Sequence, residues 1–156
     1  MEKHIYFDWS GTLAFPKTRH ELAKGNINVL YNDTIDLLKY LYKNKYIIGI
    51  ISNTKMDRQK FITGLAKIDI LKYFNGKIIL SSDPGMCRKS CNKIFQSINP
   101  CGLIYYVGNN YTKDIIGALN NNFIGIYKQT KDIETNLQFY NNVIIIKHLA
   151  ELQKIL

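Results

Sequence analysis

The chain has 156 residues, 46% of them hydrophobic, which is enough for one sizeable core and too short for two ordinary domains, so we expect a single domain over 1–156. No stretch approaches the roughly 20 apolar residues of a membrane span, and three cysteines make no disulfide framework, which predicts a cytoplasmic protein without a membrane partner. The net charge of +9 favours anionic partners, but the lysines are scattered and not interleaved with aromatic residues, which leaves nucleic acid a minor alternative.

Strands and helices are expected to alternate along the chain. Short apolar runs predict strands at 5–7, 46–51, 77–80, 103–107, 123–127 and 143–146. Helical spacing of apolar residues predicts helices at 34–43, 55–67, 89–98 and 112–120, with another at the carboxyl terminus; in the first, Ile35, Leu38, Leu41 and Tyr42 are expected to face the core. This alternation predicts an α/β fold, a Rossmann-like, doubly wound parallel sheet.

Two further stretches are interpreted from their composition. The segment 13–28 is polar and contains Pro16, Gly25 and several basic side chains, so we expect a short flap there that can attract an anionic ligand. Cys87 and Cys91 lie one helical turn apart, but no histidine nearby in the sequence completes a zinc site, and small residues on a helix face are the preferred interpretation.

The first strand stops abruptly at the turn Asp8-Trp9-Ser10-Gly11-Thr12. A buried parallel strand would deliver the Asp8 carboxylate to the carboxyl edge of the sheet, where open α/β folds keep their sites. Gly11 permits a tight turn, and the Thr12 hydroxyl can hydrogen-bond a neighbouring carboxylate or phosphate oxygen. An ordinary β-turn is the alternative, since Asp, Ser and Gly are common turn residues.

Residues suited to chemistry also follow three later strands: Ser52 and Asn53, then Lys89, then Asn109 and Asp114. A carboxylate nucleophile needs its charge neutralised, an electrophile held in line, and a hydroxyl and an ammonium to grip the transferred group. The chain supplies a candidate for each role. The structural alternatives are that Ser52 caps the following helix and that Lys89 is a solvated helix residue.

In this order, the four motifs resemble those of the haloacid dehalogenase (HAD) superfamily, and the resemblance runs from the first strand to about residue 127. It implies that Asp8 forms an aspartyl-phosphate and that Ser52 and Lys89 hold the phosphoryl oxygens. A Mg²⁺ ion would neutralise the repulsion between substrate and nucleophile. The resemblance places it on Asp8, the Ser10 backbone carbonyl, Asn109 and Asp114.

The remaining residues near these motifs are assigned more loosely. Thr12 and Ser10 are counted with the catalytic group of Asp8, Ser52 and Lys89. Asn53 and Trp9 are counted with Ser52 and Lys89 as candidates for substrate binding, and a packing role for Trp9 below the turn is an equally good interpretation.

Two departures from the family pattern bear on activity. Ser10 stands where HAD phosphatases usually have a second Asp, the general acid and base, and a serine hydroxyl cannot act as a base at neutral pH. Asn109 stands where such a phosphatase usually has an Asp ligand, which removes one negative charge from the metal site. We therefore expect slow hydrolysis and weakened magnesium binding.

The spacing of the motifs leaves no room for a cap domain, since Asp8 and Ser52 are 52 − 8 = 44 positions apart and a helix and a strand take up over half of them. The resemblance then implies a capless HAD hydrolase, a magnesium-dependent phosphatase or phosphotransferase with weakened turnover. Its substrate would be a phosphorylated small molecule or macromolecule. The alternative is a catalytically impaired HAD-fold module that binds a phosphorylated ligand or a protein partner.

Overall fold

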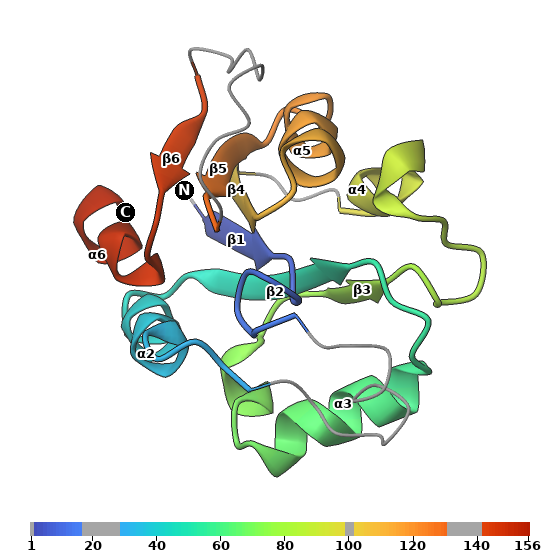
Figure 1. The fold of residues 1–156 in the computed structure, drawn as a ribbon, viewed down its shortest axis with the longest axis horizontal. Helices are drawn as coiled ribbons and strands as arrows, with labels where there is room; N and C mark the ends of the chain where they lie inside the picture. Colours follow the sequence, from blue (N-terminus) through green and yellow to red (C-terminus); the bar gives the residue numbers. More distant parts are fainter. Residues whose placement is uncertain (1, 17–28, 99–101, 131–141) are drawn as a thin grey trace.

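The computed structural model describes residues 2–16, 29–98, 102–130 and 142–156, and its centre is one six-stranded sheet (Figure 1). The strand order is β3-β2-β1-β4-β5-β6, and all five neighbouring pairs are parallel. The strands are β1 Lys3–Phe7, β2 Ile47–Ser52, β3 Ile78–Leu80, β4 Leu103–Gly108, β5 Ile124–Lys128 and β6 Ile144–Ile146. The predicted α/β fold with a doubly wound parallel sheet is confirmed.

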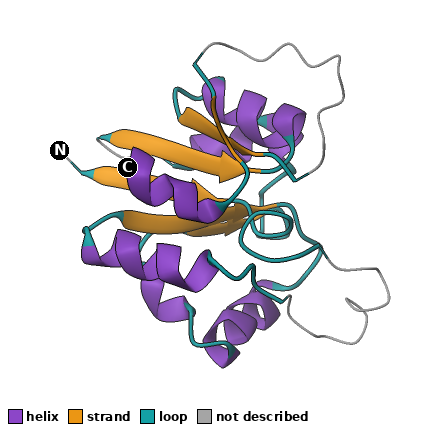
Figure 2. Ribbon diagram, turned by 60° about the vertical axis from the view of Figure 1, so that its left-hand side comes forward, coloured by secondary structure: helices purple, strands orange, loops and turns teal. Residues whose placement is uncertain are grey.

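Helices cover both faces of this sheet (Figures 1 and 2). One face packs against α2 (Thr34–Lys43), α3 (Arg58–Lys67) and α6 (Leu152–Ile155), with Phe7, Leu38 and Leu65 in the shared core. The other packs against α4 (Lys93–Gln96) and α5 (Gly117–Leu119) around Phe95 and Tyr106. Strands buried on both faces need apolar side chains at successive positions, which explains the short continuous apolar runs in the sequence.

The strand register brings the ends of β1, β2 and β4 together. Phe7 lies opposite Ile50 on one side and Val107 on the other, and the Asp8 amide donates to the Val107 carbonyl at 2.9 Å. Because the winding reverses between β2 and β4, β1 lies at the switch point where open α/β sheets form crevices. Asp8 therefore stands at the carboxyl edge, as predicted.

Three expected helices differ in detail. The helix expected at 55–67 begins at Arg58, because the Asp57 side chain caps it by accepting from the Gln59 and Lys60 amides. The helix expected at 89–98 is broken: a 3₁₀ turn covers Lys89–Cys91, Asn92 is left-handed at φ 56°, and α4 follows. The helix expected at 112–120 is a π-helix, Tyr111–Ile116, continued by α5.

The helix α2 has the predicted bounds but a rotated inner face. Leu38 and Leu41 are fully buried as expected, whereas Ile35 and Tyr42 are 39% and 50% exposed. Leu37, which the spacing argument left out, is buried in their place. The inner face of α2 therefore lies along Thr34, Leu37, Leu38 and Leu41.

The expected flap at 13–28 is described only at its base, since 17–28 lie outside the described residues. Leu13 and Ala14 are fully buried and belong to the core, a correction to the predicted start of the flap. The Phe15 amide donates to the Val29 carbonyl, and the Tyr31 amide to the Leu13 carbonyl, so the two arms pair. Between β1 and α2, the described residues form no cap domain. Among all the residues that the structure describes, no helix is long and apolar enough to cross a membrane.

Candidate functional site

The centre of the site is a buried cluster of one ammonium and two carboxylates. Lys89 Nζ lies 2.6 Å from Asp8 Oδ1 and 2.7 Å from Asp114 Oδ1. The whole Lys89 residue is 2% exposed, Asp8 8% and Asp114 2%. Charges are rarely buried to this extent unless they are paired, and here three elements far apart in the sequence each contribute one. The alternative interpretation, that Lys89 is a solvated helix residue, is wrong, because Lys89 is buried.

Burial and the neighbouring opposite charges have opposing effects on the pKa values of Asp8 and Lys89. The pKa of Asp8 is raised to about 6, mainly by burial; the Lys89 ammonium opposes this rise and the Asp114 carboxylate adds to it. Burial alone would lower the pKa of Lys89, but the two carboxylates more than offset this and raise it. The cluster therefore pairs a Lys89 that holds its proton firmly with an Asp8 that is less acidic than usual.

Lys89 is held from its backbone as well as from its ammonium. Its amide donates to Asn53 Oδ1 at 2.9 Å, and Asn53 directly follows β2. Its ammonium also lies 5.5 Å from the centre of the Tyr106 ring, a cation–π contact. Asn53, predicted from the sequence as a substrate contact, thus lies where it positions the turn that carries Lys89.

Three oxygen-bearing groups converge beside the Lys89 cluster. The terminal amide of Asn109 lies 3.2 Å from Asp8 Oδ2 and 3.0 Å from the Ser10 carbonyl oxygen. With its nitrogen turned towards them the amide donates to both, and with its oxygen turned towards them three oxygens face one another. In an octahedron with Mg²⁺–oxygen distances of 2.0–2.1 Å, neighbouring oxygens are about 2.9 Å apart. With its oxygen turned towards them, the Asn109 amide lies near this spacing from both Asp8 Oδ2 and the Ser10 carbonyl oxygen.

The Asp8 turn, residues 8–12, has to bend tightly to bring these groups together. Gly11 has φ +82°, and a Cβ there would lie 2.3 Å from the Asn109 amide nitrogen. The turn thus requires glycine for its conformation and for the close approach of Asn109. The Thr12 hydroxyl lies 3.3 Å from Asn109 Oδ1, so Thr12 supports the amide.

Asp114 faces Lys89, and both of its oxygens already have partners. Oδ1 accepts from Lys89, and Oδ2 accepts from the Asn110 amide at 2.9 Å. The Tyr106 hydroxyl, which donates to the Ile51 carbonyl, is 3.5 Å from Asp114 Oδ1. The direct role of Asp114 as a metal ligand therefore stays a prediction, whereas its pairing with Lys89 is observed.

The other predicted site residues lie around this centre. Ser52 is 3% exposed at the end of β2, and its carbonyl accepts from the Ser81 amide. The Ser10 side chain is exposed to solvent. Trp9 is 5% exposed and its ring meets that of Phe61 edge-on at 5.6 Å, which favours the packing role that the sequence left open.

Metal binding here would depend on carbonyl and amide oxygens as well as Asp8. Within the described ranges no group of three or more His, Cys, Asp or Glu side chains could hold a metal ion. The zinc alternative at the cysteines finds no support, because Cys87 and Cys91 are joined in a disulfide and Cys101 lies outside the described residues.

Lys128 is a buried residue of this edge that the sequence reasoning missed. It ends β5, is 3% exposed, and its ammonium donates to the Thr12 carbonyl at 2.9 Å. The ammonium also lies 3.1 Å from the centre of the Tyr31 ring. Lys128 thus ties the Asp8 turn to the base of the flap. A lysine at the carboxyl end of an otherwise apolar strand was the available signal.

Lys128 should make the stability of the fold depend on pH. Burial lowers its pKa from 10.5 to about 8, with the charge of Asp33 opposing the change. Between these values the unfolded chain binds more protons at this lysine, so stability rises with pH. In denaturant titrations, the unfolding free energy of wild type minus that of Lys128→Met should grow by on the order of 2–3 kcal/mol from pH 7 to 10.5, at about 1.36 kcal/mol per pKa unit. A difference between wild type and Lys128→Met that stays constant with pH would contradict this prediction.

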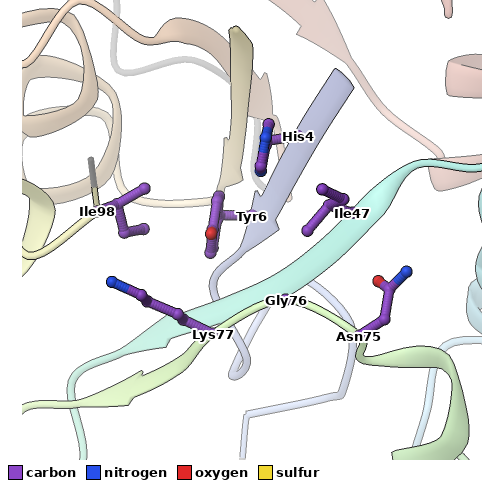
Figure 3. A pocket seen from close by; sticks show the side chains of 7 residues that line it. All are labelled: His4, Tyr6, Ile47, Asn75, Gly76, Lys77 and Ile98. Carbon is purple, nitrogen blue, oxygen red and sulfur yellow. The ribbon is translucent and has the colours of Figure 1, made fainter. Parts of the chain in front are cut away.

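A cavity of about 350 Å³ lies at the opposite end of the sheet (Figure 3). It is lined by His4, Tyr6, Ile47, Asn75, Gly76, Lys77 and Ile98. His4 and Tyr6 precede Asp8 on β1, which places the cavity towards the amino ends of the strands. None of the site residues predicted from the sequence lines this cavity. The paired charges of Lys89, Asp8 and Asp114 lie at the carboxyl edge of the sheet instead.

Comparison of the sequence with protein-family models and with curated proteins gives no match. Solved structures do match. An uncharacterized protein from Listeria monocytogenes serotype 4b is 24% identical, with a TM-score of 0.79 over 98% of this chain and 96% of that one. D,D-heptose 1,7-bisphosphate phosphatase from B. bronchiseptica, complexed with magnesium and phosphate, is 13% identical, with a TM-score of 0.78 over 97% and 96%.

A HAD phosphatase from Thermococcus onnurineus is 26% identical, with a TM-score of 0.62; the match covers 81% of this chain and 58% of that protein. The sheet order and the reversal beside β1 define a doubly wound α/β domain, and the candidate site lies at its switch point. Together with these matches they identify the fold as the core of the HAD superfamily.

Proposed function

We propose that the protein is a capless, magnesium-dependent phosphatase or phosphotransferase that acts through an aspartyl-phosphate on Asp8. The observation that carries this proposal is the buried contact of Lys89 with both Asp8 and Asp114, at 2.6 and 2.7 Å. Such a cluster is costly to bury, so it points to a functional site. Two solved structures with this fold are phosphatases, and one of them holds magnesium and phosphate.

The first chemical step would be attack of the Asp8 carboxylate on the phosphorus of a phosphate monoester. A bond forms between an Asp8 oxygen and phosphorus, the bond from phosphorus to the leaving oxygen breaks, and that oxygen takes a proton from water. Lys89 would turn from Asp8 towards the phosphoryl oxygens, and the Ser52 hydroxyl would donate to another. Water then attacks the phosphorus and releases phosphate from Asp8.

Magnesium, when bound, would neutralise the negative charge shared by the substrate and Asp8. The residues that would hold it are Asp8, the Ser10 carbonyl and Asn109, with the Asn109 amide oxygen turned towards the other two. Asp114 would contribute mainly by holding Lys89. In this arrangement Asn109 supplies an uncharged ligand, so binding should be weaker than with a second carboxylate.

The magnesium site is tested by comparing wild type with Asn109→Asp. Release of phosphate from p-nitrophenyl phosphate should require Mg²⁺ and stop in EDTA. The added charge in Asn109→Asp should lower the half-saturating magnesium concentration by on the order of tenfold, if it contributes about 1.4 kcal/mol. Hydrolysis that persists in EDTA would contradict the proposal.

A second candidate is a HAD-fold module that binds a phosphorylated ligand or a protein without turnover. It is favoured by Ser10, whose exposed hydroxyl offers no general base. Asn109 also favours it, because it weakens the metal site. The retained pairing of Asp8, Lys89 and Asp114 favours the enzyme. Magnesium-dependent binding of inorganic phosphate by calorimetry, without phosphate release from any ester, would support this second function.

A further inference from the structure

A cross-link encloses the turn that presents Lys89. Cys87 and Cys91 are joined in a disulfide, with Cα atoms 6.3 Å apart, within the range that a disulfide spans without backbone movement. Lys89 lies midway between them and is the one fully buried residue of this five-residue loop. The disulfide of this loop therefore lies at the protein surface, and the ion pairs of Lys89 lie in the interior.

Besides the cross-link, this loop is held through Lys89, whose amide donates to Asn53 Oδ1 and whose ammonium pairs with Asp8 and Asp114. The 3₁₀ turn is only three residues long, and its amide hydrogen bonds are Cys91 to Arg88 at 3.0 Å and Asn92 to Lys89 at 3.4 Å. Asn92 then takes the left-handed conformation, so α4 does not continue the turn. The turn therefore has few backbone hydrogen bonds of its own, and the cross-link adds a restraint on the backbone at either side of Lys89.

The cross-link is open to reagents in solution. Cys91 is exposed and Cys87 is partly exposed. A small thiol can therefore attack the Cys91 sulfur, breaking its bond to Cys87 and releasing the Cys87 thiolate. A second thiol attacks the mixed disulfide, so that two thiols are oxidised to one disulfide while the protein gains two electrons and two protons.

We propose that Cys87 and Cys91 are a reversible redox site that controls how firmly Lys89 is held. In the disulfide form the loop fixes Lys89 between Asp8 and Asp114. In the dithiol form the loop gains freedom, and the Lys89 ammonium is less well placed. Because the loop is short, the chain-entropy effect on overall stability is small, and the change stays local. The effect on catalysis, but not the redox site itself, rests on the proposed function.

The redox site is tested first by mass spectrometry and hydrogen exchange, which need no activity. Glutathione and its disulfide, mixed at increasing ratios, should convert the protein between forms that differ by two alkylatable thiols. On reduction, amides of residues 87–92 should exchange about tenfold faster, with the rest of the chain unchanged. Equal exchange in the two forms, or faster exchange throughout the chain, would overturn the proposal.

Matched variants separate the redox site from the proposed function. Cys87→Ser and Cys91→Ser should exchange like the reduced wild type whatever the glutathione ratio, and Cys101→Ser should respond like wild type. Phosphate release should rise on oxidation in wild type and Cys101→Ser only. If no protein releases phosphate but exchange at 87–92 still follows the glutathione ratio, the proposed function fails and the redox site stands. Release that ignores the ratio while exchange follows it would overturn control of Lys89.

Discussion

Asp8→Asn should abolish phosphoenzyme formation. Incubated with Mg²⁺ and acetyl phosphate, the wild-type protein is expected to gain about 80 Da, one phosphoryl group, and the variant none. The amide introduced by this substitution has nearly the shape of the Asp8 carboxylate, but its oxygen carries no negative charge and is too weak a nucleophile to attack phosphorus. The adduct should persist in wild type, because Ser10 offers no base to activate water. Intact-protein mass spectrometry measures it directly.

The folding control for this variant follows from the charges around Lys89. Asp114 remains 2.7 Å from the ammonium, so Asp8→Asn leaves one carboxylate for one ammonium and no unpaired buried charge. The variant is therefore expected to fold, and a cooperative unfolding transition would show it. An adduct on folded Asp8→Asn would place the phosphoryl group elsewhere and exclude Asp8 as the nucleophile.

Much of the fold follows from simple patterns. The inner strands of the sheet are largely buried on both faces, so they leave apolar runs such as Ile47–Ile51 that local sequence patterns detect. The carboxyl edge follows from the alternation of strands and helices, which is why Asp8, Lys89 and Asp114 could be expected to meet. The distances between these three side chains could not be predicted, since they depend on the register between β1, β2 and β4.

The features that local sequence patterns did not predict depend on contacts between residues distant in the sequence or on unusual backbone conformations. The break at Asn92 has no proline or glycine to mark it, and the π-helix at Tyr111–Ile116 keeps helical spacing of its apolar residues. Lys128 was missed because its partner, the Thr12 carbonyl, lies 116 positions away in the sequence. The role of Asn53 in holding the Lys89 amide likewise joins two loops that only the fold brings together.

Ser10→Asp should raise the rate of phosphoenzyme hydrolysis by about 10²–10⁴-fold, the usual contribution of a general acid and base. The Ser10 side chain is exposed, so a carboxylate there stays solvated and costs little stability. Its backbone carbonyl, 3.0 Å from the Asn109 amide, is kept in the variant. Single-turnover decay of the phosphorylated protein, followed by mass, isolates this step from the attack by Asp8.

Ser10→Asn is the matched control for this gain, because it has the size of Asp without a group that can take up a proton. If both variants speed hydrolysis equally, shape or hydration rather than proton transfer limits the wild type. If Ser10→Asp folds and forms the phosphoenzyme but decays no faster, a missing base is not the defect. A gain confined to Ser10→Asp would mean that the Lys89 cluster and the metal ligands are already arranged for turnover, and that one side chain limits the rate.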